Sequence, residues 1–142
     1  MDLYMDHLQA VLDGIDRPVV VIGHSSGGII ASQLTELMPD QVAGLIYLTA
    51  MMLPAGMRFA ELVAELTPDH PEVVGIVPYL DWSNDGETST VRPGAAQEVF
   101  LHDCTPEQAD AAAAKLKPHP QRGRDICAVL SEANFGRVPR AY

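Results

Sequence analysis

Ser25 lies at the centre of a short motif whose residue types could support nucleophilic chemistry. Residues 23–27 read Gly-His-Ser-Ser-Gly, which satisfies the G-x-S-x-G pattern. A serine at the tip of a tight strand-to-helix turn projects its hydroxyl beyond the strand, where it can attack a carbonyl carbon. Unpaired N–H groups at the start of the helix would favour the resulting oxyanion. The motif therefore predicts a nucleophile, Ser25, and one oxyanion donor, the backbone N–H of Ser26.

The glycines of the motif fit a turn so tight that a Cβ at Gly23 or Gly27 would collide with neighbouring backbone. The alternative is an ordinary tight turn, as found in many strand-to-helix units, including those that bind phosphates. The run lacks the G-x-G-x-x-G spacing and the P-loop lysine, which disfavours a nucleotide site. His24 adjoins Ser25 and points in another direction, so we expect it to pack or to support the turn, and not to act as a base.

Two apolar segments flank the motif in the arrangement that it requires. Residues 18–23 form a continuous β-branched run, which is typical of a strand buried on both faces of a parallel sheet. Helical spacing follows up to Pro39, and residues 42–48 repeat the buried-strand pattern. Strand, helix and strand in this order indicate a right-handed parallel βαβ unit. The predicted fold class is therefore α/β.

Further elements are predicted on both sides of this unit. Residues 2–12 should form an amphipathic helix whose apolar face consists of Leu3, Tyr4, Leu8, Val11 and Leu12. Short hairpin strands are expected around residues 79–82 and 88–91. A capped helix should begin at Thr105, with Gln108 completing a capping box, and should run to the lysines before Pro118.

The run VIGHSSGGIIASQLTELMPDQVAGLIYLTAMMLPAG resembles the nucleophile strand, elbow helix and following strand of the α/β-hydrolase superfamily, within it the group of hydroxynitrile lyases and plant-type methyl esterases. YLDW resembles the start of that group's cap, FLHDCTPEQADAAAAKL its cap helices, and NFGRVPRAY the lead-in to the next core strand. The resemblance implies an incomplete α/β-hydrolase fold. Its parallel-sheet core would comprise residues 1–52 and 122–142, and a small, mostly helical cap would comprise residues 53–121.

The resemblance also implies roles for individual residues. Ser25 would be the nucleophile and Ser26 the N–H donor, while Trp82 matches a cap tryptophan that lines the substrate tunnel in relatives. A packed aromatic side chain in a small cap explains Trp82 equally well. His102, Asp103 and Cys104 are sequence neighbours and cannot converge on one atom as a catalytic dyad does, so we expect a structural role for them.

The family's other catalytic parts have no counterpart in this sequence. In the family the oxyanion loop precedes the elbow, and the acid and the histidine follow it. Too few residues precede position 18 to supply that loop, none of the five histidines stands at the family's catalytic position, and the chain ends at Tyr142 where the strand toward the acid begins. We therefore expect a serine carboxylesterase for small esters that is part of a longer protein, with its acid and base outside this chain.

Two other functions fit the same residues: a catalytically incomplete fragment or interaction module, and a hydroxynitrile lyase on the same fold. The nucleophile strand is expected to have an unpaired edge and an uncovered apolar face. Further chain segments or a homo-oligomer would cover them.

Composition excludes several classes of partner. Nineteen acidic against nine basic side chains give a net charge of −10, which would repel phosphate backbones and anionic membranes. Cys104 and Cys127 fit no metal-ligand spacing, and we expect neither a metal nor a cofactor. No apolar run approaches the ~20 residues of a membrane span, and acidic residues stand where a signal peptide needs basic ones. We expect a cytoplasmic protein that binds a small-molecule ester.

Overall fold

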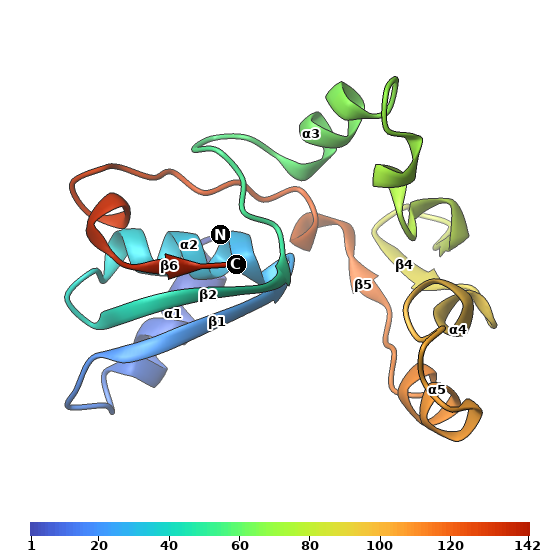
Figure 1. Ribbon diagram of the computed structural model, residues 1–142, viewed down its shortest axis with the longest axis horizontal. Coiled ribbons are helices and arrows are strands. Elements are labelled where there is room, and N and C mark those ends of the chain that lie inside the picture. The colour runs from blue at the N-terminus through green and yellow to red at the C-terminus, as the bar shows by residue number, and fades with distance from the viewer. The chain divides into compact units, whose positions relative to one another are not determined.

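The computed structural model describes residues 1–142, which divide into two compact units (Figure 1). The first consists of Met1–Glu61 and Ile126–Tyr142, and we call it the elbow unit. The second consists of Leu62–Asp125, and we call it the inserted unit because it interrupts the first along the chain.

A parallel sheet forms the centre of the elbow unit. Its strands are β1 (Val19–Ser25), β2 (Val42–Ala50) and β6 (Arg140–Ala141), in the order β1-β2-β6. Helix α2 (Gly27–Leu37) connects β1 to β2. The predicted parallel βαβ unit and the α/β fold class are therefore confirmed. In this order β1 is an edge strand, and its outer edge pairs with no other strand.

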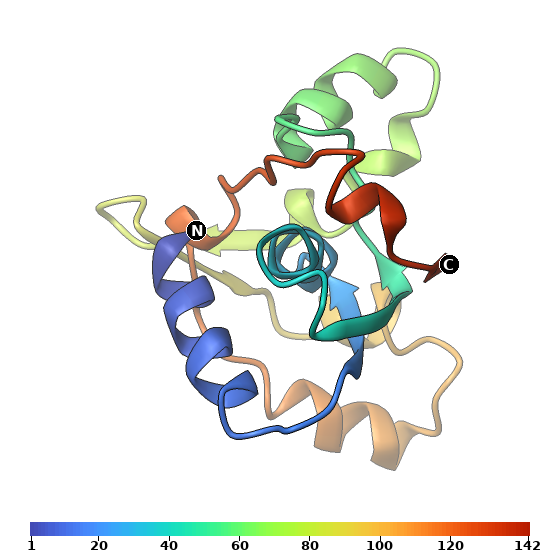
Figure 2. The same ribbon diagram turned by 90° about the vertical axis from the view of Figure 1, so that its left-hand side faces the viewer.

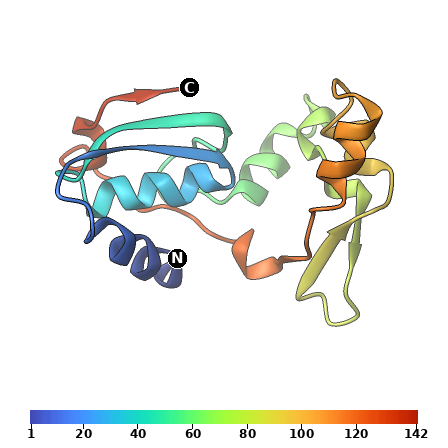
Figure 3. The same ribbon diagram turned by 90° about the horizontal axis from the view of Figure 1, so that it is seen from below.

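Helices α1 (Asp2–Leu12) and α2 lie on the same side of the sheet (Figures 2 and 3). The predicted helix over residues 2–12 is confirmed, and its predicted apolar face is right for Leu8 and Leu12 but wrong for the other three residues. Met5 and Leu12 are buried in a cluster with Leu34 of α2. Three residues assigned to the apolar face are exposed: Leu3, Tyr4 and Val11. Met5, which the predicted face omits, lies seven residues before Leu12 and shares its helix face, so the buried face includes Met5 in place of the three exposed residues.

The covered face of the sheet packs against α2 around Tyr47, which is buried with Leu45 and Ala31. The Tyr47 hydroxyl lies 2.6 Å from Ser32 Oγ, and Ser32 Oγ donates to the carbonyl of Gly28 at 2.8 Å. Because Ser32 has one hydroxyl hydrogen, Tyr47 is the donor in their shared bond. Burial raises the pKa of Tyr47 and outweighs the opposing effects of its hydrogen-bonded neighbour Ser32 and of the positive charge of Arg140.

Within the elbow unit, no helix covers the opposite face of the sheet (Figure 3). Val20 and Ile22 of β1 are 57% and 61% exposed, and Ile46 and Leu48 of β2 are 37% and 56% exposed. We call these four side chains the open face. The prediction that the strand at 18–23 is buried on both faces is therefore wrong for this chain, because its helices cover only one of them.

Polar side chains of α2 hold the segment that returns to β6. The Gln33 side-chain oxygen accepts a hydrogen bond from the backbone N–H of Val129 at 2.9 Å. The Glu36 carboxylate accepts four hydrogen bonds from residues 131–135, at 2.8 to 3.3 Å. Burial of this carboxyl raises its pKa, but the hydrogen bonds from the segment lower it by more, so the net pKa of Glu36 lies below its ordinary value.

The inserted unit contains an antiparallel sheet and short helices. Its strands are β3 (Leu80–Trp82), β4 (Thr88–Val91) and β5 (His119–Pro120), in that order. The two predicted hairpin strands are confirmed, whereas β5 was not predicted. The α-helices of this unit are α4 (Ala95–Val99) and α5 (Pro106–Ala113), while α3 (Phe59–Leu66) begins in the elbow unit and ends in the inserted unit. Short 3-10 helices span Pro71–Val74, Val77–Tyr79, Gln121–Gly123 and, in the elbow unit, Phe135–Arg137.

Helix α5 begins as predicted and ends earlier. Thr105 Oγ1 accepts from the N–H of Gln108, and the Gln108 side chain accepts from the N–H of Thr105, so the capping box is confirmed. The helix ends at Ala113, and Lys115 and Lys117 lie beyond its last turn. The prediction that these lysines support the helix C-terminus is therefore wrong. After Ala113 the chain forms a tighter turn instead. Its backbone hydrogen bonds join residues three positions apart, such as the N–H of Lys115 and the carbonyl of Ala112.

Candidate active site

Ser25 occupies the corner between β1 and α2, at the carboxyl end of the strand. Its side chain is exposed, and its φ of 53° lies in the left-handed region that non-glycine residues rarely adopt. Such a conformation costs of order 1–3 kcal/mol and persists only where the surrounding structure enforces it. The backbone of the corner is therefore strained at the residue that the motif predicts as the nucleophile.

Two glycines allow the close approach that enforces this conformation. A Cβ on Gly23 would lie 2.8 Å from the Cα of Gly28 and 2.9 Å from the carbonyl oxygen of Gly27, which is too close. A Cβ on Gly28 would lie 2.6 Å from the carbonyl oxygen of Met51. The predicted crowding is confirmed at Gly23 and wrong at Gly27, whose Cβ would meet nothing within 4 Å. Gly28, the second residue of α2, is instead the position where a Cβ would collide, because this residue packs against the end of β2.

A bulge in β2 lies opposite the corner, and the sequence analysis did not predict it. His24 pairs with Leu48 and Ser25 pairs with Ala50, so Thr49 is an extra residue in β2. Thr49 is the other non-glycine residue with a positive φ, at 42°. A threonine near the end of an apolar strand carries no local signal for such a bulge.

The chain after the bulge completes the corner. The N–H of Met51 donates to the carbonyl oxygen of Ser25 at 2.9 Å. The same residue bounds the space beside Gly28. The end of β2 thus contacts both the strand and the helix that meet at Ser25.

The backbone at Ser26 is arranged as the start of a helix. Ser26 has helical dihedral angles, φ −62° and ψ −17°, and its side chain makes no capping hydrogen bond. Its carbonyl accepts from Ile29 at 3.2 Å, while its own N–H donates to no acceptor in the structure. A free N–H next to the serine at a helix N-terminus can donate to an oxyanion.

The Ser25 hydroxyl has no hydrogen-bond partner in the structure, and no histidine of the elbow unit bonds to it. His7 lies on α1 and His24 directly precedes Ser25. His24 is exposed and follows Val20 and Ile22 at alternate positions of β1, on the open face. His24 is therefore not packed within the elbow unit, and its alternative role in supporting the turn stays a prediction.

The other residues singled out in the sequence lie in the inserted unit. Trp82 ends β3, pairs with Ser89 of β4 and is partly exposed, so its role in a pocket stays a prediction. Of the neighbours His102, Asp103 and Cys104, the structure joins only the last two, through a weak contact of 3.9 Å between Cys104 Sγ and Asp103 Oδ1. No group of three or more His, Cys, Asp or Glu side chains could hold a metal ion. No helix has the length and apolar composition to cross a bilayer.

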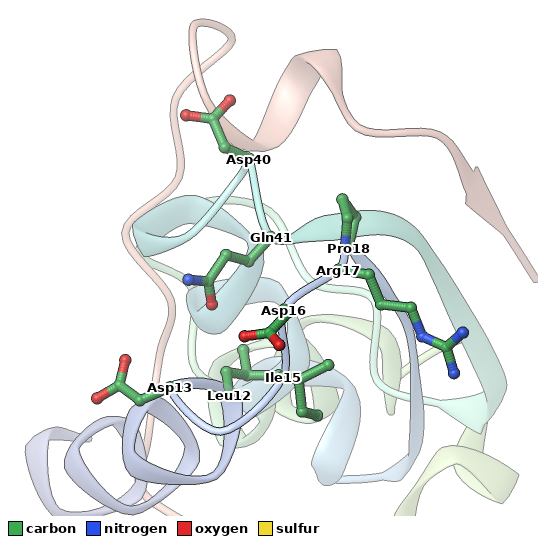
Figure 4. Close-up of a pocket in the computed structure, with 8 residues that line it drawn as sticks. All are labelled: Leu12, Asp13, Ile15, Asp16, Arg17, Pro18, Asp40 and Gln41. Carbon is green, nitrogen blue, oxygen red and sulfur yellow. The ribbon is translucent and has the colours of Figure 1, made fainter.

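One hollow of the elbow unit lies away from Ser25, at the amino end of β1. It has a volume of about 400 Å³, and Figure 4 shows the side chains that line it. They are Leu12, Asp13, Ile15, Asp16, Arg17, Pro18, Asp40 and Gln41. Because ligands of open α/β sheets bind at the carboxyl ends of the strands, this hollow is not the predicted substrate site.

Comparisons with known proteins agree with this architecture. The model of a family described as the alpha/beta hydrolase family matches residues 2–142. A pyrethroid hydrolase from Sphingobium wenxiniae is 27% identical over an alignment that covers 100% of this chain and 51% of the relative. Methylesterase 17 from Arabidopsis thaliana is 23% identical, with 87% of this chain and 48% of the relative covered. The lipase LipV from Mycobacterium tuberculosis is 41% identical, with 49% of this chain and 28% of the lipase covered.

Solved structures show the same fold. Polyneuridine aldehyde esterase superposes with a TM-score of 0.73 at 20% identity, covering 98% of this chain and 58% of the esterase. Tomato methylketone synthase I with bound 2-tridecanone superposes with a TM-score of 0.74 at 18% identity. The match covers 96% of this chain and 56% of the synthase. The chain thus spans about half the length of the relatives that it matches over most of its own length.

Proposed function

Because the chain belongs to the alpha/beta hydrolase family, we propose that it is the nucleophile-bearing part of a serine carboxylesterase acting on small esters. Relatives that carry the names hydrolase, lipase and methylesterase support this reaction class. Other relatives named as synthases show that the fold also hosts different chemistry, so the assignment depends on the residues of the site.

In the proposed reaction the Ser25 Oγ forms a bond to the ester carbonyl carbon, and the carbonyl π electrons move to the oxygen. The proton of the hydroxyl passes to a general base, which we assign to the part of the protein outside this chain, together with its acid partner. Collapse of the tetrahedral intermediate breaks the bond to the alcohol, which leaves with that proton. Water then attacks the acyl-enzyme, releases the carboxylic acid and restores Ser25.

The backbone of the corner contributes to the transition state. As the carbonyl oxygen becomes negative, the free N–H of Ser26 would donate to it, and the dipole of α2 would favour the same charge. Losing one such donor typically slows an enzyme by about 10²–10³. In this proposal the Ser26 side chain has no role.

One observation carries the proposal: Ser25 has a φ of 53° at an exposed corner. A plain structural turn would place a glycine at such a position, because glycine adopts a positive φ without strain. Here the glycines occupy neighbouring positions and the strained residue is a serine. Strain retained at a residue with an exposed nucleophilic oxygen supports a catalytic role.

The test is covalent labelling of the protein, as purified from the cells that make it, with a fluorophosphonate followed by peptide mass mapping. We expect the adduct on Ser25 and no labelling of the Ser25→Ala variant. Ser26→Ala is the matched control, because it removes the adjacent hydroxyl and keeps the N–H, and it should be labelled like the wild type. Equal labelling of Ser25→Ala would contradict the proposal.

A second candidate is a catalytically incomplete chain or an interaction module. The specific observation in its favour is that the Ser25 hydroxyl has no hydrogen-bond partner in the structure. Without an acid and a base, the site would retain only a residual rate enhancement. An active site without its triad typically accelerates the reaction by roughly 10³–10⁴-fold over water. Hydrolysis of p-nitrophenyl acetate by the purified 142-residue chain at ordinary enzyme rates would exclude this candidate.

A hydroxynitrile lyase on the same fold would use the corner for proton transfer instead of acyl transfer. The two activities have different readouts. A lyase releases cyanide from a cyanohydrin and forms no acyl-enzyme, whereas an esterase accumulates or turns over an acyl group on Ser25.

A further inference from the structure

A row of three side chains crosses the antiparallel sheet of the inserted unit. In the register of this sheet Trp82 of β3 pairs with Ser89 of β4, and Ser89 pairs with His119 of β5. Directly opposed residues of antiparallel strands point to the same face, with Cβ atoms about 4.5–5.5 Å apart. Ser89 is therefore flanked by an indole on one side and an imidazole on the other. Ser89 is 1% exposed, whereas Trp82 is 46% exposed.

Arg124, directly after the 3-10 helix Gln121–Gly123, reaches this row. Its Nη2 donates a hydrogen bond to Ser89 Oγ at 3.0 Å. The Nε of Arg124 is buried and bonds to nothing, and the same is true of Nδ1 of His119. Because Ser89 Oγ accepts from Arg124, its own hydrogen is left without an acceptor in the structure. Three polar groups at one place in the sheet therefore lack a hydrogen-bond partner.

Arg124 also lacks a counter-ion. The other two arginines of the inserted unit each have one: Arg92 lies 2.7 Å from the carboxylate of Asp81. Arg122 lies 3.9 Å from that of Glu87. Burial lowers the pKa of Arg124, and no neighbouring carboxylate opposes this effect. A buried positive charge without a partner costs free energy, and here it persists in a chain with nineteen acidic side chains.

The unpartnered groups are mainly donors, and this determines which ligand fits them. The Nε–H of Arg124 can only donate, the Ser89 hydroxyl has its hydrogen free, and His119 Nδ1 donates when it carries a proton. A cation would leave these donors unpaired. A carboxylate fits, because its two oxygens match the planar edge formed by Nε and Nη2 and accept charge-assisted hydrogen bonds. The partly exposed ring of Trp82 offers apolar contact to the rest of such a ligand.

We propose that Arg124, Ser89 and His119 form a binding site for a small organic carboxylate in the inserted unit, with the apolar part of the ligand against Trp82. Water does not reach the unpartnered Arg124 and His119 nitrogens in the structure, so we expect the exposed Trp82 ring to move when the ligand enters. The carboxylic acid that an ester hydrolase releases belongs to this ligand class. The proposal does not depend on the nucleophilic role of Ser25, because binding is measured without turnover.

The probe is phenylacetate, and phenylacetamide is its uncharged counterpart of nearly the same shape. The purified 142-residue chain is titrated with each compound at constant ionic strength. Calorimetry measures binding, and the fluorescence of Trp82, the one tryptophan of the chain, reports on the site. We expect phenylacetate to bind saturably, to change the fluorescence, and to bind at least about tenfold more tightly than phenylacetamide, which lacks the charge.

Two arginines two positions apart provide matched variants. Arg124→Met removes the guanidinium and should weaken phenylacetate binding at least about tenfold. Arg122→Met removes the same charge from a side chain that is 92% exposed, and it should bind phenylacetate like the wild type. Without ligand, Arg124→Met should unfold at the wild-type temperature or above it, because an unpaired buried charge is removed. Ser89→Ala is a second variant, and it should also weaken binding, since it removes one of the donors.

Three outcomes overturn the proposal. Absence of saturable phenylacetate binding would leave trapped water as the partner of the unpaired groups. Equal affinity for phenylacetate and phenylacetamide would show that the site recognises no charge. Equal weakening by Arg124→Met and Arg122→Met would assign the effect to the overall charge of the chain and not to this cluster.

Discussion

The two faces of the β1–β2 sheet carry similar side chains but have different neighbours. On one face Leu45 is 1% exposed and Tyr47 is held by Ser32 of α2. On the other face Ile22 and Leu48 are more than half exposed. The same strands supply both sets. The difference shows that helix cover, and not the apolar content of a strand, decides whether its side chains form a core.

A matched pair of truncations in β2 measures this difference directly. We expect Leu45→Ala to lower the free energy of unfolding by about 2–5 kcal/mol, because it leaves a cavity in the covered face. Leu48→Ala makes the same chemical change on the open face and should change it by no more than about 0.5 kcal/mol. Urea unfolding of both variants is the measurement. Similar losses for the two would show that the open face is packed in solution.

The next largest effect should come from the helix approach on the covered side. Gly28→Ala places a Cβ against the carbonyl of Met51, and we expect it to cost about 1–3 kcal/mol in stability as α2 is pushed from the sheet. Gly27→Ala is the control, since its Cβ meets nothing within 4 Å. Thermal unfolding followed by circular dichroism compares them. Equal midpoints would mean that α2 does not approach β2 so closely.

The polar link inside the covered face should contribute less. Tyr47→Phe removes the hydroxyl that donates to Ser32 and keeps the ring, so we expect a loss of about 0.5–1.5 kcal/mol. Ser32 still donates to Gly28 O in the variant. The check is the urea midpoint together with near-ultraviolet circular dichroism, which should retain the signal of a packed core. A stabilised variant would count against the hydrogen bond.

The smallest effect concerns the clamp between α2 and the return segment, and it depends on pH. Burial raises the pKa of Glu36, but hydrogen bonds from Ser131, Phe135 and Asn134 lower it by more. Because the folded pKa is below the unfolded one, the carboxylate stabilises the fold above its ordinary pKa, and this contribution is lost as the pH falls through the folded value.

The measurement for this clamp compares wild type with Glu36→Gln. At about pH 7 the variant should be less stable by roughly 1 kcal/mol or less, since the site is partly solvated. The difference should shrink toward about pH 3, where the wild-type carboxyl is protonated. A difference that stays constant with pH would show that the charge of Glu36 has no part in the clamp.

Much of the fold follows from local patterns in the sequence. The βαβ unit, the hairpin strands and the capping box of Thr105 and Gln108 are confirmed, as are the α/β fold class and the α/β-hydrolase family. Each depends on residues close together along the chain. Part of the apolar face of α1, the end of α5 and the burial of β1 were predicted wrongly, because they depend on which distant elements pack against each one.

The candidate site divides in the same way. The G-x-S-x-G motif, by itself, placed Ser25 between a strand and a helix and predicted it as the nucleophile, a role that stays a proposal. Only the tertiary structure decided that Gly28 and not Gly27 meets Met51, that Thr49 bulges opposite Ser25, and that one sheet face stays open. These features arise where the end of β2 contacts the start of α2. Such contacts join residues about twenty positions apart in sequence, and no local propensity encodes them.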